Sequence, residues 1–274
     1  MRFSELLKIE LMKYRRSKII PLIFIAPILV VSSGIANLSA YFTPEYTNAW
    51  PTMFIQSALL YAYYLLPFSM IVVCVMIASQ ETNHNGLLKM MSLPVSRQAL
   101  SLAKFCILIF YLFMEIFVFL AVFVIAGYIA VSTFDITEAL PISYLLKWCV
   151  GLFLTMLPSL AVMWMLTVLF EKTLFSVGLN LLLVIPGLLA GASPVWFLYP
   201  YCYSGYLVSL SLHAFTTEGT AGTALQLFPF IPCALLIFLS ALFISASRFS
   251  MSLAACQVKL AIPSGNGGVL GNKL

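Results

Sequence analysis

The stretch FCILIFYLFMEIFVFLAVFVIAGYIA, residues 105–130, decides the fold class of this chain. Glu115 is its only charged residue, and its length exceeds the roughly 20 apolar residues that a helix needs to cross a bilayer. The whole chain shares this character, because 62% of its 274 residues are hydrophobic and only 8% are charged. Soluble domains are about 25% charged, so the composition excludes a soluble enzyme, a disordered chain and a disulfide scaffold.

Five further stretches are long and apolar enough to span a membrane. They cover residues 19–41, 53–78, 147–170, 174–192 and 225–247. Together with 105–130 they predict an all-α polytopic membrane protein with six transmembrane helices. The transmembrane domain covers residues 19–247, after an N-terminal segment 1–18 and before a tail 248–274.

The positive charges fall on one side of the predicted membrane. Six of the 14 lysines and arginines lie in residues 1–18, and only Lys147, at a span edge, lies on the opposite side. Because loops rich in lysine and arginine stay in the cytoplasm, both termini are expected there. The basic N-terminus abuts an apolar span, which indicates anionic lipid rather than nucleic acid as its partner.

The sequence shows no pattern for catalysis, for a metal site or for nucleotide binding. The six cysteines form no CxxC pair, and we interpret them as small packing residues. The isolated His84 and His213 lack the spacing of metal ligands, and the glycine-rich tail lacks the GxxxxGK[ST] spacing of an ATP-binding loop. We therefore expect no cofactor in this chain, with energy supplied by a partner or an ion gradient.

Residues 1–18 predict an amphipathic helix on the inner face of the membrane. An apolar stripe recurs there at helical spacing, and most charges lie elsewhere. Its members are Phe3, Leu6, Leu7, Leu11 and Tyr14. Glu10 stands three residues before Lys13, which is the spacing of an ion pair on a helix. The helix is either a topology anchor or a mechanical element.

The cytoplasmic loop 79–104, SQETNHNGLLKMMSLPVSRQALSLAK, is too short for a domain and too patterned for a plain connector. Leu87, Leu88 and Met91 belong to a small apolar patch. Pro94 then breaks the helix, and Ser96 can cap the next one. An exposed apolar patch on a short cytoplasmic helix predicts a docking surface, with a helix resting on lipid as the alternative.

These features resemble the membrane subunit of type 2 ABC exporters. The loop pattern consists of Glu81, then Gly86 to Leu88, then Leu93 to Arg97, then Lys104 before the third span. The N-terminal pattern of Glu10, Lys13, Ser17, Lys18, Pro21 and Pro27 is similar to the lantibiotic-immunity branch of that family. Six spans, cytoplasmic ends and a long outer connection after the fifth span extend the resemblance over nearly the whole chain.

The resemblance implies that loop 79–104 sits in a cleft of a cytosolic ABC ATPase dimer and that the N-terminal helix is a second transmission element. The coupling residues would be Glu81, Gly86, Leu87, Leu88, Met91, Pro94 and Arg97. It also implies a second permease subunit, identical or homologous, with ATP and Mg bound by the ATPase, in the bacterial plasma membrane. The cargo would be an amphiphilic antimicrobial peptide of the lantibiotic kind.

The outer connection 193–224 is rich in aromatic residues, among them Trp196, Tyr199 and Tyr203. Amphipathic aromatics settle at the membrane interface, so we expect short helices that dip into the outer leaflet. They form either a lid over the exit path or an aromatic belt that anchors the protein.

Glu115 lies near the middle of the third span, where a carboxylate is costly and should face the bundle or a cavity. Three roles compete for it. It contacts a cationic cargo, pairs with a polar group such as Gln56 or Asn180, or sits neutral in a packed helix contact.

The sequence thus predicts a non-enzymatic permease subunit of an ATP-driven exporter. A gradient-driven carrier or channel is the alternative, although such proteins usually show inverted repeats or several intramembrane ionisable groups. Export of another amphiphilic substrate also stays open, whereas an intramembrane enzyme would need a catalytic pair that the sequence does not show.

Overall fold

The computed structural model describes residues 3–14, 19–36, 49–82, 97–133, 142–170, 172–216 and 227–261. Every regular element within these ranges is a helix. The elements are α1 Phe3–Tyr14, α2 Ile19–Ala36, α3 Ala49–Leu60, the π-helix η2 Tyr61–Leu65, α4 Leu66–Thr82, α6 Arg97–Thr133, α7 Ile142–Leu169, α8 Thr173–Val184, α9 Gly187–Gly191, the 3₁₀ turns η4 Trp196–Leu198 and η5 Pro200–Cys202, α10 Tyr203–Thr216 and α11 Leu227–Ala261. The predicted all-α fold is confirmed.

The described residues contain six stretches that are long and apolar enough to cross a membrane. They are Ile19–Ala36, Ser57–Gln80, Gln98–Ile129, Ile142–Leu169, Thr173–Gly191 and Phe228–Arg248. The number of spans and their places agree with the sequence. The third span differs most, because its apolar helix begins at Gln98 rather than near Phe105. Lys104 was predicted to end the cytoplasmic loop, but its side chain is fully buried inside the protein.

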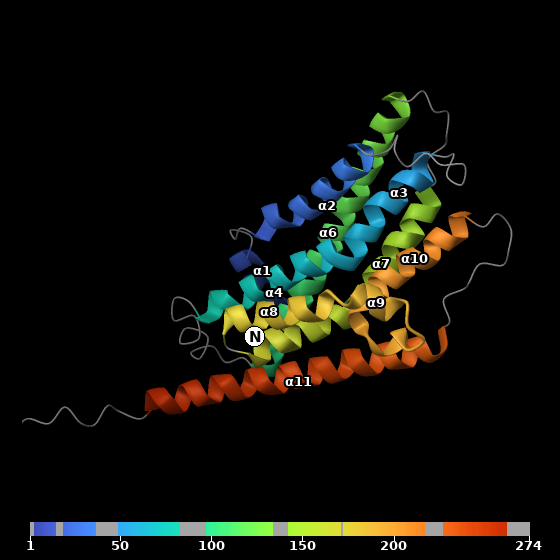
Figure 1. The fold of residues 1–274 in the computed structure, drawn as a ribbon. Helices are drawn as coiled ribbons and strands as arrows, with labels where there is room; N and C mark the ends of the chain where they lie inside the picture. The colour runs from blue at the N-terminus through green and yellow to red at the C-terminus, as the bar shows by residue number, and fades with distance from the viewer. Residues whose placement is uncertain are drawn as a thin grey trace, which may run out of the picture.

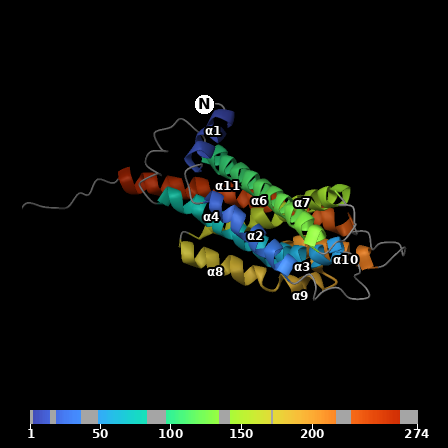
Figure 2. The same ribbon diagram turned by 90° about the horizontal axis from the view of Figure 1, so that it is seen from above.

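The helices form a bundle in which the chain passes back and forth between two ends. One end of the bundle in Figures 1 and 2 contains α1, the end of α4, the start of α8 and the end of α11. The other end contains the end of α6 and the starts of α3, α7 and α11. This alternation is what six consecutive spans with both termini on one side require.

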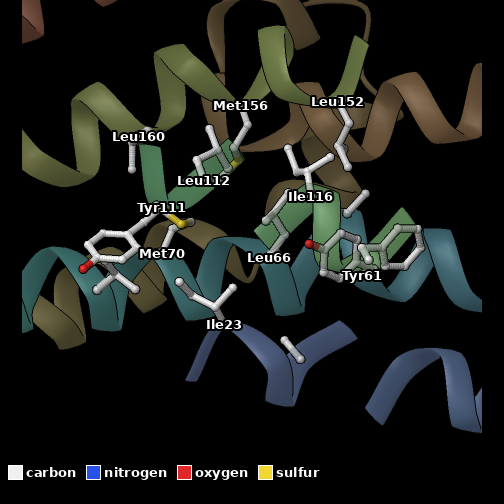
Figure 3. Close-up of a cluster of buried hydrophobic side chains, with 14 of the residues drawn as sticks. Ile23, Tyr61, Leu66, Met70, Tyr111, Leu112, Ile116, Leu152, Met156 and Leu160 are labelled. Carbon is white, nitrogen blue, oxygen red and sulfur yellow. The ribbon is translucent and has the colours of Figure 1, made fainter. Parts of the chain in front are cut away.

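The core of the bundle lies between α2, α4, α6 and α7. Figure 3 shows Ile23 of α2 below Met70 of α4, with Leu112 of α6 and Met156 of α7 above them. All four side chains are buried. Lipid tails are as apolar as these residues, so close van der Waals packing holds such a bundle together more than the hydrophobic effect does.

The second span is interrupted by the π-helix η2, which separates α3 from α4. Short π-helical segments inside longer helices often occur at functional sites. The outer segment packs directly against this irregular stretch: Ser204 donates a hydrogen bond of 2.8 Å to the Ala62 carbonyl. Gly205 follows it, and a Cβ at this position would overlap the ring of Tyr63. The absence of a side chain at residue 205 therefore lets α10 approach η2.

Gly205→Ala should destabilise the protein, because the added methyl group meets Tyr63 near the base of its ring. Overpacking of this kind costs about 1–3 kcal/mol. Thermal unfolding of the purified protein in detergent measures the loss. Gly178→Ala in α8 is the matched control, since no atom lies within 4 Å of the added Cβ and alanine favours a helix over glycine. Equal melting temperatures for the two variants would contradict the close packing.

Candidate coupling site and central carboxylate

The N-terminal helix α1 lies against the start of α6. Leu6 of α1 packs with Leu100 and Ala103 of α6 in a small buried cluster. The buried stripe of α1 is Leu6, Glu10 and Tyr14, which are spaced four residues apart and share one helix face. The face of α1 that packs against the protein therefore carries a carboxylate at its centre. Phe3, predicted for the apolar stripe, is exposed.

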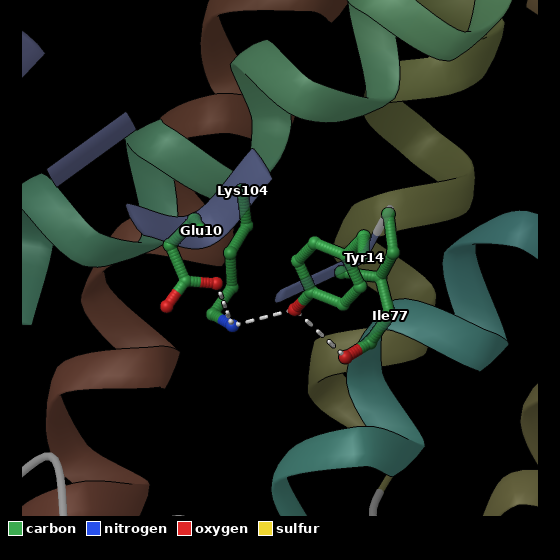
Figure 4. A network of polar contacts seen from close by, with 4 residues as sticks. All are labelled: Glu10, Tyr14, Ile77 and Lys104. Atoms are coloured by element: carbon green, nitrogen blue, oxygen red, sulfur yellow. Dashed lines mark hydrogen bonds and ion pairs between the residues drawn. The ribbon is translucent and has the colours of Figure 1, made fainter. Parts of the chain in front are cut away.

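Glu10 and Lys104 form a buried ion pair with 3.4 Å between Oε2 and Nζ. The Lys104 side chain is fully buried, and Glu10 is 3% exposed. Lys104 Nζ also donates to the Tyr14 hydroxyl at 3.2 Å, and that hydroxyl donates to the Ile77 carbonyl at 3.5 Å. Figure 4 shows the four groups in sequence, from the carboxylate through the ammonium and the phenol to the carbonyl.

This network connects three helices at a defined place in the chain. Glu10 and Tyr14 belong to α1, Lys104 to α6 and Ile77 to α4. Residues 83–96 follow the end of α4 and precede the start of α6, so α1 is bonded to the helices on both sides of that segment. The network therefore joins α1 to the two helices that border residues 83–96.

The sequence did not reveal the Glu10–Lys104 pair. Helical spacing predicts a pair between Glu10 and Lys13 on the same helix, and the sequence places Lys104 at the end of the cytoplasmic loop. Two signals were present in the sequence. Glu10 lies between Leu6 and Tyr14 on the apolar stripe, and Lys104 follows an almost wholly apolar stretch from Ala99. A charge at each of two buried positions predicts a partner, because an unpaired buried charge is very costly.

Most of the predicted coupling residues lie outside the described ranges. They are Gly86, Leu87, Leu88, Met91 and Pro94. Glu81 belongs to the end of α4 and Arg97 is the first residue of α6, but their side chains are not among those described. α6 starts at Arg97, directly after Ser96, which is where the sequence predicts the start of this helix.

Glu115 is fully buried in α6. The Ser69 hydroxyl of α4 donates a hydrogen bond to its Oε1. Oε2 has no hydrogen-bond partner within the described part of the chain. The suggested partner Asn180 is engaged elsewhere: its Oδ1 accepts from Tyr201 at 2.9 Å and its Nδ2 donates to the Ser176 carbonyl at 2.9 Å. The other suggested partner, Gln56, belongs to α3, and its side chain is not among those described.

The outer connection forms the short helices that the sequence predicts, and they fold back against the bundle. Tyr199 donates to the Leu183 carbonyl, and Tyr203 donates to the Phe197 carbonyl. Trp196 stacks on Tyr206 with ring centroids 4.0 Å apart. The predicted cargo residues therefore do not form one cluster: Trp196 and Tyr203 pack with Phe230, while Glu115 contacts Ser69.

Cys202 belongs to the same cluster as Trp196 and Tyr203, and its thiol lies 3.1 Å from the Tyr199 carbonyl oxygen. Burial raises the pKa of this thiol to about 12, so it stays neutral at physiological pH. All five cysteines whose side chains the structure describes are free, and three of them are buried. This agrees with their interpretation as packing residues.

The described residues thus form a bundle with six candidate membrane spans, in which the N-terminal helix α1 is hydrogen-bonded to α4 and α6. Residues 6–187, more than half of the chain, match the family model described as ABC-2 family transporter protein. The chain belongs to this family. No curated protein and no solved structure gave a significant match.

Membership settles the general role of the chain. It is a multi-pass membrane protein and the permease subunit of an ABC exporter, for which the bacterial plasma membrane is the usual setting. The subunit is not catalytic, since ATP hydrolysis in this family belongs to a separate ATPase partner.

Removing one member of the Glu10–Lys104 pair should destabilise the protein strongly. Glu10→Leu or Lys104→Met leaves the opposite charge buried and unpaired, at a cost of about 3–5 kcal/mol. The double variant, which removes both charges, should recover most of that loss. Thermal unfolding in detergent measures all three, with Lys172→Met as the control because Lys172 is exposed. The pairing would be contradicted if the double variant lost as much stability as the two single variants lose together.

Proposed function

We propose that this permease exports cationic, amphiphilic antimicrobial peptides of the lantibiotic kind and so protects the cell that makes or meets them. The N-terminal sequence pattern supports the cargo, through its likeness to lantibiotic-immunity permeases. The single observation that supports an ATP-driven mechanism is the Glu10–Lys104–Tyr14 network, because it joins α1 to the helices on both sides of residues 83–96.

Coupling then proceeds through residues 79–104. The ATPase holds the apolar patch at Leu87, Leu88 and Met91 and moves it when ATP and Mg bind in the ATPase and the dimer closes. The displacement passes to α4 and α6, which are continuous with this segment. Because α1 is hydrogen-bonded to both helices, it moves with them and switches the bundle between inward and outward access.

The functional assembly contains two permeases, identical or homologous, and two ATPases. Six spans are few for enclosing a peptide route. In addition, the helices α8 and α11 carry many exposed apolar side chains, which face lipid or the second subunit. The aromatic outer segment, with Trp196, Tyr199 and Tyr203, lies where an amphiphilic peptide leaves the membrane, and we assign it the role of a lid.

Leu88→Asp or Met91→Asp should abolish co-purification of the ATPase, because a charge replaces an apolar docking contact. The measurement is the amount of ATPase retained when the tagged permease is purified from cells that express both proteins. Leu270→Asp, the same chemical change in the tail, is the control and should retain the ATPase. Full retention by the loop variants would contradict docking at residues 83–96.

The proposed cargo is tested by measuring the resistance of cells to antimicrobial peptides. Cells that express the chain with its ATPase should tolerate more of a cationic lantibiotic, while their sensitivity to a neutral amphiphilic peptide of similar length stays unchanged. Cells with an ATPase that cannot hydrolyse ATP are the control. Unaltered sensitivity across a panel of lantibiotics, with both proteins present in the membrane, would contradict the proposed cargo.

A further inference from the structure

Three buried polar atoms on the second, third and fourth spans lack hydrogen-bond partners within the described residues. They are Oε2 of Glu115, the hydroxyl of Tyr61 and Nε1 of Trp148. Tyr61 and Glu115 are fully buried, and Trp148 is 4% exposed. Unsatisfied polar groups at this depth are expensive, and intramembrane ionisable residues commonly mark substrate pathways. Their gathering therefore points to a binding site.

An aromatic column begins next to Glu115. Phe119 follows Glu115 by one helical turn and stacks on Tyr61, with ring centroids 4.3 Å apart. Phe119 lies 5.7 Å from Trp148, and Trp148 lies 4.8 Å from Phe54. Tyr61, Phe119, Trp148 and Phe54 thus form a continuous series of rings from three spans, which we call the aromatic column.

The column leads from the carboxylate toward the predicted outer end of the bundle. Phe54 lies near the start of α3 and also contacts Tyr144, near the start of α7, at 5.9 Å. Both helices start at that end of the bundle in Figures 1 and 2. Figure 3 shows Tyr61 beside Ile116 of α6, at the level of the core. The series of rings therefore runs from the level of Glu115 toward the predicted outer end of the bundle.

Within the described residues no lysine or arginine neutralises Glu115. Lys104 lies on the same helix, but it is eleven residues away, about 16 Å along the axis, and it is paired with Glu10. The site therefore offers one carboxylate oxygen, a phenol hydroxyl and aromatic faces. An alkylammonium group matches this set, because a carboxylate attracts its charge and ring faces attract cations within about 6 Å of their centroids.

We propose that Glu115, Tyr61 and the aromatic column form the recognition site for an ammonium group of the cargo. This inference rests on the proposed function and adds the chemical feature that the permease selects. In the present structure the rings pack on one another, so the site is closed. The π-helix η2 carries Tyr61, and a change of register there separates Tyr61 from Phe119 and admits the ammonium group.

The test compares two probes of equal chain length, octylammonium and octanol. Isothermal titration of the permease–ATPase assembly in lipid nanodiscs measures their binding, with protein-free nanodiscs as the blank. Wild type should bind octylammonium about tenfold or more tightly than octanol, which is the factor that corresponds to the weakest couplings measured for close charge pairs across interfaces. Glu115→Gln should abolish the preference while octanol still binds.

Further variants separate recognition from folding. Phe119→Leu should lower the affinity for octylammonium and leave that for octanol nearly unchanged, because it removes a ring face but keeps the volume apolar. Glu115→Asp, which retains the charge, should keep part of the preference. Trp164→Phe is the matched control, since Trp164 is also buried with an unpartnered Nε1 but lies outside the column, and it should bind like wild type.

Equal affinity of wild type for the two probes would overturn the inference, and so would a full preference in Glu115→Gln. If cells gain lantibiotic resistance but the purified assembly shows no preference for ammonium, the recognition site is wrong and the proposed function stands. If the preference is present and depends on Glu115, but no lantibiotic is resisted, the site stands and the proposed cargo is wrong.

Discussion

The buried ion pair between Glu10 and Lys104 determines how the cytoplasmic end of the bundle is built. Lys104 can be buried inside the protein only because a carboxylate meets it there, and the carboxylate comes from a helix outside the six spans. The pair therefore fixes α1 against α6, and the Tyr14 hydroxyl extends the connection to α4. Together with the apolar cluster of Leu6, Leu100 and Ala103, this pair holds α1 on the bundle.

The need to pair every buried polar group also determines how the other end of the bundle is packed. Polar groups that are shielded from water must find partners within the protein. The outer segment meets this requirement by turning its hydroxyls toward backbone carbonyls: Ser204 bonds to Ala62 of η2 and Tyr203 to Phe197. The segment is thereby packed onto the bundle. Among the described residues, Glu115 and Tyr61 belong to the buried side chains whose polar atoms lack a hydrogen-bond partner, and this is the basis of the ammonium site proposed above.

The sequence alone predicted the fold class, the six spans and the short outer helices. Each of these depends on local composition, such as the apolar run around Glu115. The sequence could not predict the contacts that join distant segments of the chain. Glu10 and Lys104 are 94 residues apart, and Ser69, which contacts Glu115, is one of many serines in an apolar stretch. Helical spacing reveals which residues share a face, but the partner of that face depends on tertiary packing. The loop residues from Gly86 to Pro94 stay predictions.

The central claim is that α1 moves together with α6 during transport. A disulfide between Leu6→Cys and Ala103→Cys, whose native side chains pack in one cluster, tests it in an otherwise cysteine-free chain. ATP-driven export is measured in the reconstituted assembly before and after oxidation. If the two helices move as one unit, export by the cross-linked protein equals that of the reduced protein. Loss of export on cross-linking, restored by reduction, would show that α1 must slide on α6 and would contradict the claim.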